Sequence, residues 1–281
     1  MGVLFEQESS TPSSGRAGYD PKFYAELASV EDKHFWFQAR NLLVSLLTGQ
    51  LTRFLRPGYR VLEIGCGNGN VLRTLSRVCR QGIVVGFDLF LEGLLLASRR
   101  TNCALVQGDI RFPPFGAPFD IVCMLDVLEH IRDDRAALSR AWELVVPGGV
   151  ILITVPARAS LWSYFDVVSG HVRRYEEREL HDKLRNAGFS VEFTSPYLAT
   201  IYPLVWLSRR WQELRCRRGP LDSKQQHDLA RQQLRIVPVL NSVLTSWLEL
   251  EVRLVASRRR LPLGASLIAV ARKPAEPPLI S

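Results

Sequence analysis

Residues 61–70, VLEIGCGNGN, contain a short apolar run followed by three glycines at alternate positions. Gly65, Gly67 and Gly69 lack Cβ atoms, so the backbone there can take positive φ values and approach a ligand closely. The residues that follow have a helical pattern, and the N-terminus of such a helix points toward the ligand. The stretch therefore predicts a strand, a ligand-binding turn and a helix in succession.

The glycine spacing excludes two common nucleotide-binding turns. The dinucleotide pattern G-x-G-x-x-G requires glycine at position 70, where this chain has Asn70, and the phosphate-binding loop requires a Gly-Lys-Ser/Thr sequence that does not follow here. The remaining pattern is G-x-G-x-G, with an acidic residue, Glu63, two positions before the first glycine.

Strand and helix patterns alternate after Pro57-Gly58. Several of the strands are continuous Val/Ile/Leu runs, which is typical of parallel strands covered on both faces. Such alternation predicts a doubly wound, mostly parallel α/β sheet that binds ligands outside the carboxyl ends of its strands. Strands are predicted at 60–64, 83–87, 103–106, 120–125, 150–155, 190–195 and 266–272, and helices at 69–80, 90–99, 133–145 and 176–187.

Five segments resemble, in order and spacing, the motifs of class I S-adenosylmethionine-dependent methyltransferases of the small-molecule, ubiquinone-biosynthesis type. After residues 61–70 come VVGFDLF, LVQGDIRFPPF, FDIVCMLDVLEHI and PGGVILITVP. The resemblance covers residues 58–196 and the final strand at 266–274. It implies a Rossmann-like, seven-stranded sheet whose last two strands form an antiparallel pair.

The resemblance implies S-adenosylmethionine as the cofactor. Asp88 would bind the ribose hydroxyls, Asp109 would meet the adenine amine beside Ile110, and the turn at 65–69 would hold the methionine part. The predicted cofactor-binding residues are Glu63, Gly65, Cys66, Gly67, Asn68, Gly69, Asp88, Leu89, Asp109, Ile110 and Leu125.

Methyl transfer from a sulfonium requires a positioned nucleophile and, for a hydroxyl acceptor, removal of a proton. The segments LEHI and SGHVRRYEEREL (169–180) supply suitable side chains. We predict His130, His171 and Tyr175 as catalytic residues and Glu129, Arg173 and Arg174 as acceptor-binding residues. Two alternatives stay open: Glu129 and His130 only shape a loop at the cofactor, and the arginines pair with Glu176, Glu177 or surface carboxylates. No metal is expected, because no further ligands accompany Glu129 and His130.

The N-terminal region divides into a disordered tail at 1–18 and a helical cap at 19–57. The cap contains DKHFWFQARN (32–41), which, together with Gly-His-x-Arg-Arg-Tyr, is similar to a pattern of a bacterial subgroup of the same superfamily. We predict that His34, Trp36 and Arg40 bind the substrate, with Arg40 facing the methionine carboxylate as an alternative. A second alternative is that the aromatic residues only anchor the cap.

The excess positive charge lies in the last third of the chain. Residues 197–281 hold 14 Lys and Arg against 6 Asp and Glu, which equals the net charge of +8 of the whole chain. Residues 197–265 are predicted to be a basic, apolar helical insertion between the last two strands. Its second helix ends in three arginines and carries one apolar stripe, formed by Ile236, Leu240, Val243, Leu244, Trp247, Leu250 and Leu254.

Apolar helices edged by Trp and Arg suit an anionic membrane surface, so residues 197–260 predict membrane association or a lipid-like acceptor. The alternative is that both helices pack together as a substrate-side cap or a dimer interface. Nucleic acid is disfavoured, because no RNA- or DNA-binding module is recognisable. Nothing in the sequence indicates the oligomeric state.

Five scattered cysteines without a CxxC pair are typical of reduced thiols in a cytoplasmic protein. The chain shows no leader pattern and no apolar run of about 18–20 residues. We therefore expect a cytoplasmic enzyme, peripheral on the inner face of the membrane, that methylates an oxygen of a small-molecule or lipid-linked acceptor. The alternative is a non-catalytic, membrane-recruited scaffold that binds S-adenosylmethionine.

Overall fold

The computed structural model describes residues 23–216 and 236–275. The predicted tail at 1–18 lies outside the described residues. Among the residues that are described, no helix is both long enough and apolar enough to cross a membrane.

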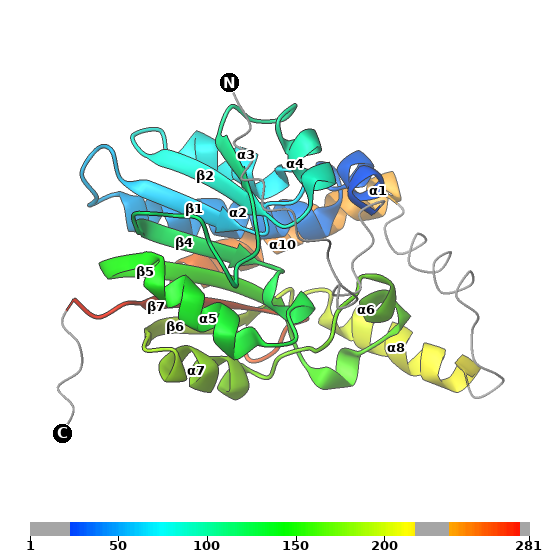
Figure 1. The fold of residues 1–281 in the computed structure, drawn as a ribbon. Helices are drawn as coiled ribbons and strands as arrows, with labels where there is room; N and C mark the ends of the chain where they lie inside the picture. The colour runs from blue at the N-terminus through cyan, green and yellow to red at the C-terminus, as the bar shows by residue number, and fades with distance from the viewer. Residues whose placement is uncertain (1–22, 217–235, 276–281) are drawn as a thin grey trace.

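The centre of the fold is a seven-stranded sheet with the order β3-β2-β1-β4-β5-β7-β6 (Figure 1). Strands β1 to β5 pair in parallel, and β7 runs antiparallel to both β5 and β6. This arrangement confirms the predicted mostly parallel sheet and its antiparallel final pair. The strands are β1 (Arg60–Ile64), β2 (Ile83–Asp88), β3 (Ala104–Gln107), β4 (Phe119–Leu125), β5 (Val145–Pro156), β6 (Ser190–Tyr197) and β7 (Ser266–Arg272).

Strand β5 is longer than predicted, because pairing with β4 starts at Val145 and continues past an irregularity to Thr154. The Pro147-Gly148-Gly149 segment lies within the bounds of β5, but in the irregularity between the paired residues Val145 and Val150. Gly148 has a φ of 79°, so the turn that the sequence indicates is kept as a bulge in the strand.

Helices cover both faces of the sheet (Figure 1). One apolar cluster joins Val61 and Cys123 to α2, α3 and α10, and a second joins Leu62 and Met124 to α5 and α7. Alternate residues of the central strands thus enter opposite cores, as the two-residue period of a strand requires. The helices are α2 (Phe35–Thr52), α3 (Asn70–Val78), α4 (Leu91–Ala97), α5 (Asp134–Glu143), α7 (Glu177–Asn186) and α10 (Pro238–Ala256).

The N-terminal cap consists of α1 (Phe23–Val30) and α2, and α10 packs along α2. The insertion between β6 and β7 also contains α8 (Tyr202–Cys216), which leaves the end of β6 beside the short helix α6 (Tyr164–Val168) (Figure 1). Helix α10 buries Leu248, Val252 and Val255 against the protein. Most of the apolar stripe predicted from the sequence lies on the exposed face of α10. This exposed face includes Leu240, Val243, Trp247, Leu250 and Leu254.

Candidate active site

The glycine turn lies at the carboxyl end of β1. Gly65, Gly67 and Gly69 have φ values of 72°, 49° and 78°, in the left-handed region that L-residues rarely adopt. A Cβ atom on Gly65 would lie 2.4 Å from Cγ2 of Val127, the second residue after the end of β4. The turn is therefore closely packed against the segment after β4, and only glycine fits there.

Asp88, the last residue of β2, holds this turn in place. Its carboxylate accepts hydrogen bonds from the backbone N–H of Gly67 (2.7 Å) and of Phe90 (2.8 Å), and the residue is buried. A carboxylate has about four acceptor positions. The contact of Asp88 with the ribose hydroxyls of the cofactor stays a prediction.

Asp109 lies beyond the end of β3 and interacts with Arg111. It accepts hydrogen bonds from the backbone N–H (2.8 Å), Nε (3.0 Å) and Nη2 (2.6 Å) of Arg111. Burial alone would raise the pKa of Asp109, but these bonds hold it below its ordinary value. The contact of Asp109 with an adenine amine stays a prediction. The neighbouring Ile110 is buried.

The other predicted cofactor-binding residues lie around the same edge of the sheet. Cys66 and Asn68 are buried in the turn, Leu125 is buried at the end of β4, and Leu89 is exposed after β2. Glu63 is buried within β1, and this burial raises the pKa of its carboxyl well above the ordinary value.

Arg40 of the cap reaches the carboxyl end of β4. Its Nη1 donates to Oδ2 of Asp126 at 2.9 Å, and Oδ1 of Asp126 accepts a bond from Thr154 at 3.0 Å. Burial alone would lower the pKa of Arg40, but the ion pair with Asp126 raises it above its ordinary value. Asp126 was not among the site residues predicted from the sequence, although its place directly after β4, where the strand order reverses, was an available signal.

A second polar contact joins the cap to the first residue of α3. Asp32 accepts bonds from Nδ2 of Asn70 (3.0 Å), Nη2 of Arg73 (2.6 Å) and Nη2 of Arg100 (2.6 Å). Asn41 donates to Oδ1 of Asn70 at 2.6 Å. Asn70, which the sequence marked only as a missing glycine, therefore links the glycine turn to the cap.

His34 and Trp36 lie at the start of α2. The Nδ1 atom of His34 accepts a hydrogen bond from the backbone N–H of Trp36 at 3.3 Å, which caps the helix. The ring of Trp36 contacts Phe165 of α6 edge-on, with centroids 6.4 Å apart. The two side chains therefore position the cap against α6, and their contact with a substrate stays a prediction.

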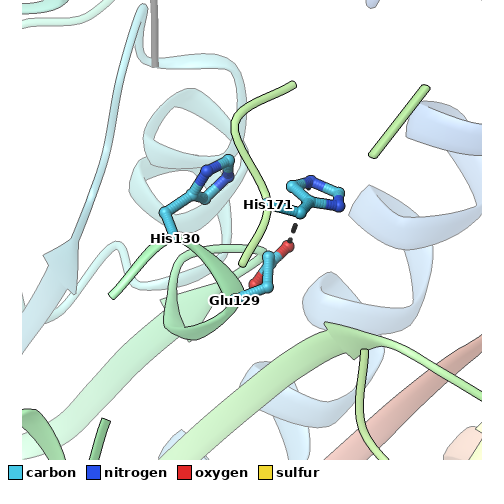
Figure 2. Close-up of side chains that lie close together, drawn as sticks. All are labelled: Glu129, His130 and His171. Atoms are coloured by element: carbon cyan, nitrogen blue, oxygen red, sulfur yellow. Dashed lines mark ion pairs between the residues drawn. The ribbon is translucent and has the colours of Figure 1, made fainter. Parts of the chain in front are cut away.

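Glu129, His130 and His171 come together near the same edge (Figure 2). Glu129 and His130 lie in the 3₁₀ turn η1 (Leu128–His130), and His171 lies in the loop after α6. The two imidazole rings meet edge to face, with centroids 4.8 Å apart, and Nε2 of His171 is 3.9 Å from Oε1 of Glu129. Burial, helped by His171, lowers the pKa of His130 to about 3, and burial raises that of Glu129 well above its ordinary value.

Arg173, Arg174 and Tyr175 bind buried carboxylates of the protein itself. Arg173 and Tyr175 donate to Oδ2 of Asp134 at 2.7 and 2.8 Å, and Arg174 donates to Oδ1 of Asp166 at 2.7 Å. These partners are neither Glu176 nor Glu177, and neither is on the surface, since both aspartates are buried. The arginines therefore hold the loop together.

The geometry opposes the proton-accepting role predicted for Tyr175. The side chain is fully buried and its hydroxyl already donates to a carboxylate. Burial and the negative charge of Asp134 raise the pKa of Tyr175 above its ordinary value, which disfavours the phenolate.

Comparison with known proteins agrees with this architecture. The model of the methyltransferase domain family matches residues 35–192. A ubiquinone biosynthesis O-methyltransferase of Psychrobacter cryohalolentis is 30% identical over 44% of this chain and 52% of its own length. The enzyme of that name from Azorhizobium caulinodans is 33% identical over 50% of this chain and 57% of its own. This chain thus spans about half the length of these relatives.

The fold also matches solved structures. The plantazolicin methyltransferase, solved with S-adenosylhomocysteine, has a TM-score of 0.56 to this chain at 15% identity, covering 90% of this chain and 91% of its own. At that identity the likeness concerns the fold alone. The match of the family model to more than half of the chain assigns the family: this protein belongs to the class I S-adenosylmethionine-dependent methyltransferases.

Proposed function

We propose that the protein transfers the methyl group of S-adenosylmethionine to a hydroxyl oxygen of a small, lipid-linked acceptor. The acceptor would be presented at an anionic membrane surface on the cytoplasmic side. The relatives named as O-methyltransferases of ubiquinone biosynthesis support transfer to oxygen on a small molecule.

The main support for methyl transfer to a hydroxyl oxygen is the position of His171 near the glycine turn. Val127 packs against Gly65 of the glycine turn, and η1 follows directly after Val127. The backbone N–H of Val172 donates to the carbonyl of Glu129 at 2.8 Å, which holds the His171 loop against η1. Both imidazoles therefore lie at the carboxyl edge of the sheet, close to the turn expected to bind the methyl donor.

His171 is the better candidate for the proton acceptor. Its Nδ1 is 2.9 Å from Oδ1 of Asp166, an arrangement that fixes the tautomer and leaves Nε2 toward Glu129. His130, with a pKa of about 3, is a weak base near neutral pH. We therefore assign proton removal to His171 and orientation of the acceptor to His130 and Glu129.

The exposed apolar side chains of α8 and α10 support a lipid-linked acceptor. Single exposed apolar residues are ordinary, but a continuous stripe indicates a binding surface. Trp247 and Leu250 of α10 are 64% and 66% exposed, and Trp206 and Trp211 of α8 are exposed as well. Exposed arginines lie beside these stripes at Arg210 and at 258–260, where they would meet anionic headgroups.

The test combines cofactor binding with transfer of a radiolabelled methyl group. The purified protein should bind S-adenosylhomocysteine in isothermal titration, and Asp88→Asn should weaken this binding at least about tenfold, one pair of hydrogen bonds being lost. Asp120→Asn is the matched control, because Asp120 accepts a backbone bond from Arg60 at the opposite end of β1.

Label from S-adenosylmethionine should enter the lipid fraction of a cell extract as an alkali-stable ether. Absence of binding would contradict the assignment of the cofactor, and label confined to aqueous metabolites would contradict the lipid-linked acceptor. Tight binding without any transfer would favour the second candidate, a membrane-recruited scaffold.

A further inference from the structure

Three side chains able to ligate a metal converge at the carboxyl edge of the sheet. One donor atom from each of Glu129, His130 and His171 lies within 4.8 Å of the others (Figure 2). Donor atoms bound about 2.1 Å from a common ion lie at most about 4.2 Å apart. Small side-chain rotations therefore bring all three within ligating distance of one ion.

Glu129 provides an independent indication of a cation. The residue is fully buried, and neither of its carboxylate oxygens accepts a hydrogen bond from another side chain in the described part of the protein. The nearest basic atom is Nε2 of His171, at 3.9 Å. A buried carboxylate is costly unless it is paired or coordinates a metal, and a divalent cation between Glu129 and the imidazoles would remove that cost.

The surroundings of His171 are those of a metal ligand. Oδ1 of Asp166 lies 2.9 Å from Nδ1 of His171, and the same oxygen accepts a hydrogen bond from Nε of Arg174 at 2.7 Å. A carboxylate on one ring nitrogen fixes the tautomer and orients the other nitrogen toward the ion. The two segments are also joined through their backbones, by the bond from Val172 to Glu129.

We propose that Glu129, His130 and His171 bind one divalent first-row transition-metal ion and leave coordination positions open for oxygen atoms of the acceptor. Two imidazoles and one carboxylate favour ions such as Mn²⁺, Co²⁺ or Zn²⁺ over Mg²⁺ and Ca²⁺, which prefer oxygen ligands. This inference differs from the expectation from the sequence that no metal binds, because the third candidate ligand joins the other two only in the fold.

The role of the ion rests on the proposed function. A coordinated hydroxyl is more acidic than a free one. In the metal-loaded protein the acceptor would therefore lose its proton to solvent, and His171 would be a ligand in place of the proton acceptor proposed above for the metal-free site. The acceptor oxygen then forms the bond to the methyl carbon, while the sulfur–methyl bond breaks and its electron pair returns to sulfur. Charge and atoms balance without any oxidant or reductant.

The first experiment measures metal binding without any activity. Untagged protein is stripped with EDTA, dialysed, and titrated with Co²⁺ by visible absorption and with Zn²⁺ and Mn²⁺ by calorimetry. We expect one ion per chain and at least about a 100-fold loss of affinity in His171→Asn and in Glu129→Gln. The matched controls are His181→Asn on α7 and Glu143→Gln on the exposed face of α5, which should bind like the wild type.

The second experiment uses the thermal midpoint. Without metal, Glu129→Gln should melt no lower than the wild type, because the buried carboxyl oxygens of Glu129 have no hydrogen bond to lose in the described part of the protein. Addition of Zn²⁺ should raise the midpoint of the wild type and leave that of Glu129→Gln unchanged. If Glu129 had a merely structural role, the metal-free Glu129→Gln variant would have a lower thermal midpoint than the metal-free wild type.

Three outcomes would overturn the inference: no binding of Co²⁺, Zn²⁺ or Mn²⁺ by the wild type, equal binding by wild type and Glu129→Gln, or full methyl transfer in the presence of EDTA. S-adenosylhomocysteine binding is measured in the same samples and reports folding of each variant. Intact cofactor binding and methyl transfer with no metal bound would overturn this inference and leave the proposed function standing. Loss of cofactor binding in the wild type would contradict the proposed function itself.

Discussion

Arg40 of the cap and Asp126 after the end of β4 form a largely buried ion pair, with Nη1 and Oδ2 2.9 Å apart and side-chain exposures of 10% and 15%. Asp126 has a φ of 55°, which Asp tolerates better than most residues. Its other carboxylate oxygen accepts the bond from Thr154 of β5. The pair therefore joins the cap to two central strands at the edge where the cofactor is expected, and it couples the placement of the cap to the integrity of the site.

Removal of one member of this pair should strongly destabilise the protein. Arg40→Met leaves the partly buried carboxylate of Asp126 without its cation, and we expect this to cost about 2 kcal/mol of unfolding free energy, between the values for exposed and for fully buried pairs. The double variant Arg40→Met/Asp126→Asn should regain much of this loss, because Asn keeps the backbone conformation without the charge. Urea unfolding followed by circular dichroism measures both values.

The control is Arg140→Met, which breaks the exposed pair with Glu143. Exposed pairs contribute little, so the change should stay below about 1 kcal/mol. Equal destabilisation by Arg40→Met and Arg140→Met would contradict the importance of the buried pair.

Gly65 and Gly148 allow the conformational and the steric requirement for glycine to be separated. Their φ values are 72° and 79°, but a Cβ atom on Gly65 would overlap Val127, whereas one on Gly148 has nothing within 4 Å. Gly148→Ala should cost about 1–2 kcal/mol of stability and leave affinity for S-adenosylhomocysteine unchanged.

Gly65→Ala should carry the same conformational cost and also displace the turn from Val127. We expect at least a tenfold loss of affinity for S-adenosylhomocysteine, measured by calorimetry on folded protein. If the two alanine variants bind the cofactor equally well, the close packing between the turn and Val127 has no role in binding.

Asp134 predicts a pH dependence of stability. Burial alone would raise its pKa, but bonds from Lys183 and Tyr175 and the charge of Arg173 hold it below the ordinary value of 3.8. Because the folded-state pKa lies below the unfolded value of about 3.9, this carboxylate stabilises the protein fully above that pH. The contribution is lost as the pH falls through the folded-state pKa.

The measurement is the free energy of unfolding of the wild type and of Asp134→Asn between pH 6 and pH 3. The difference between the two proteins should be constant from pH 6 to about pH 5 and should shrink below about pH 4. A difference that grows as the pH falls would show that the sign assigned to Asp134 is wrong.

The exposed stripe of α10 predicts binding to anionic vesicles. The triple variant Leu240→Ser/Trp247→Ser/Leu250→Ser removes exposed apolar area without touching Leu248 or Val252, which pack against the protein. The wild type should float with phosphatidylglycerol-containing liposomes at low salt and less with neutral ones, and the triple variant should remain in the pellet.

Phe112→Ser is the control for this experiment, because Phe112 is 77% exposed on a loop after β3, away from the insertion. It should float like the wild type. Flotation of the triple variant at the wild-type level would remove the membrane from the proposed function.

Much of the fold could be predicted because its signals are local. The apolar runs of β1 and β7 end where the structure ends these strands, at 60–64 and 266–272. Glycines at alternate positions, each with a positive φ, mark the turn after β1, and this signal depends on a few neighbouring residues only. Strand β5 was predicted too short, because Val145 joins it only through pairing with Phe119 of β4, across a bulge.

The candidate site was less predictable, because its residues meet through long-range contacts. His171 was selected from a local cluster of polar residues, yet its partners Asp166 and Glu129 come from α6 and η1. Asp126 lies next to predicted residues and was passed over, since its partner Arg40 is on the cap. The same holds for Arg173 and Arg174, whose carboxylate partners proved to be buried aspartates rather than nearby glutamates.

The sequence by itself determined the order of strands and helices, the glycine turn and the family, because periodicity, glycine spacing and motif order are properties of short segments. Tertiary structure alone decided which face of α10 is buried, that Arg40 pairs with Asp126, and that His171 joins Glu129 and His130. Those outcomes depend on the packing of elements distant in the chain, and a carboxylate or an imidazole looks the same in sequence whatever partner the fold brings to it.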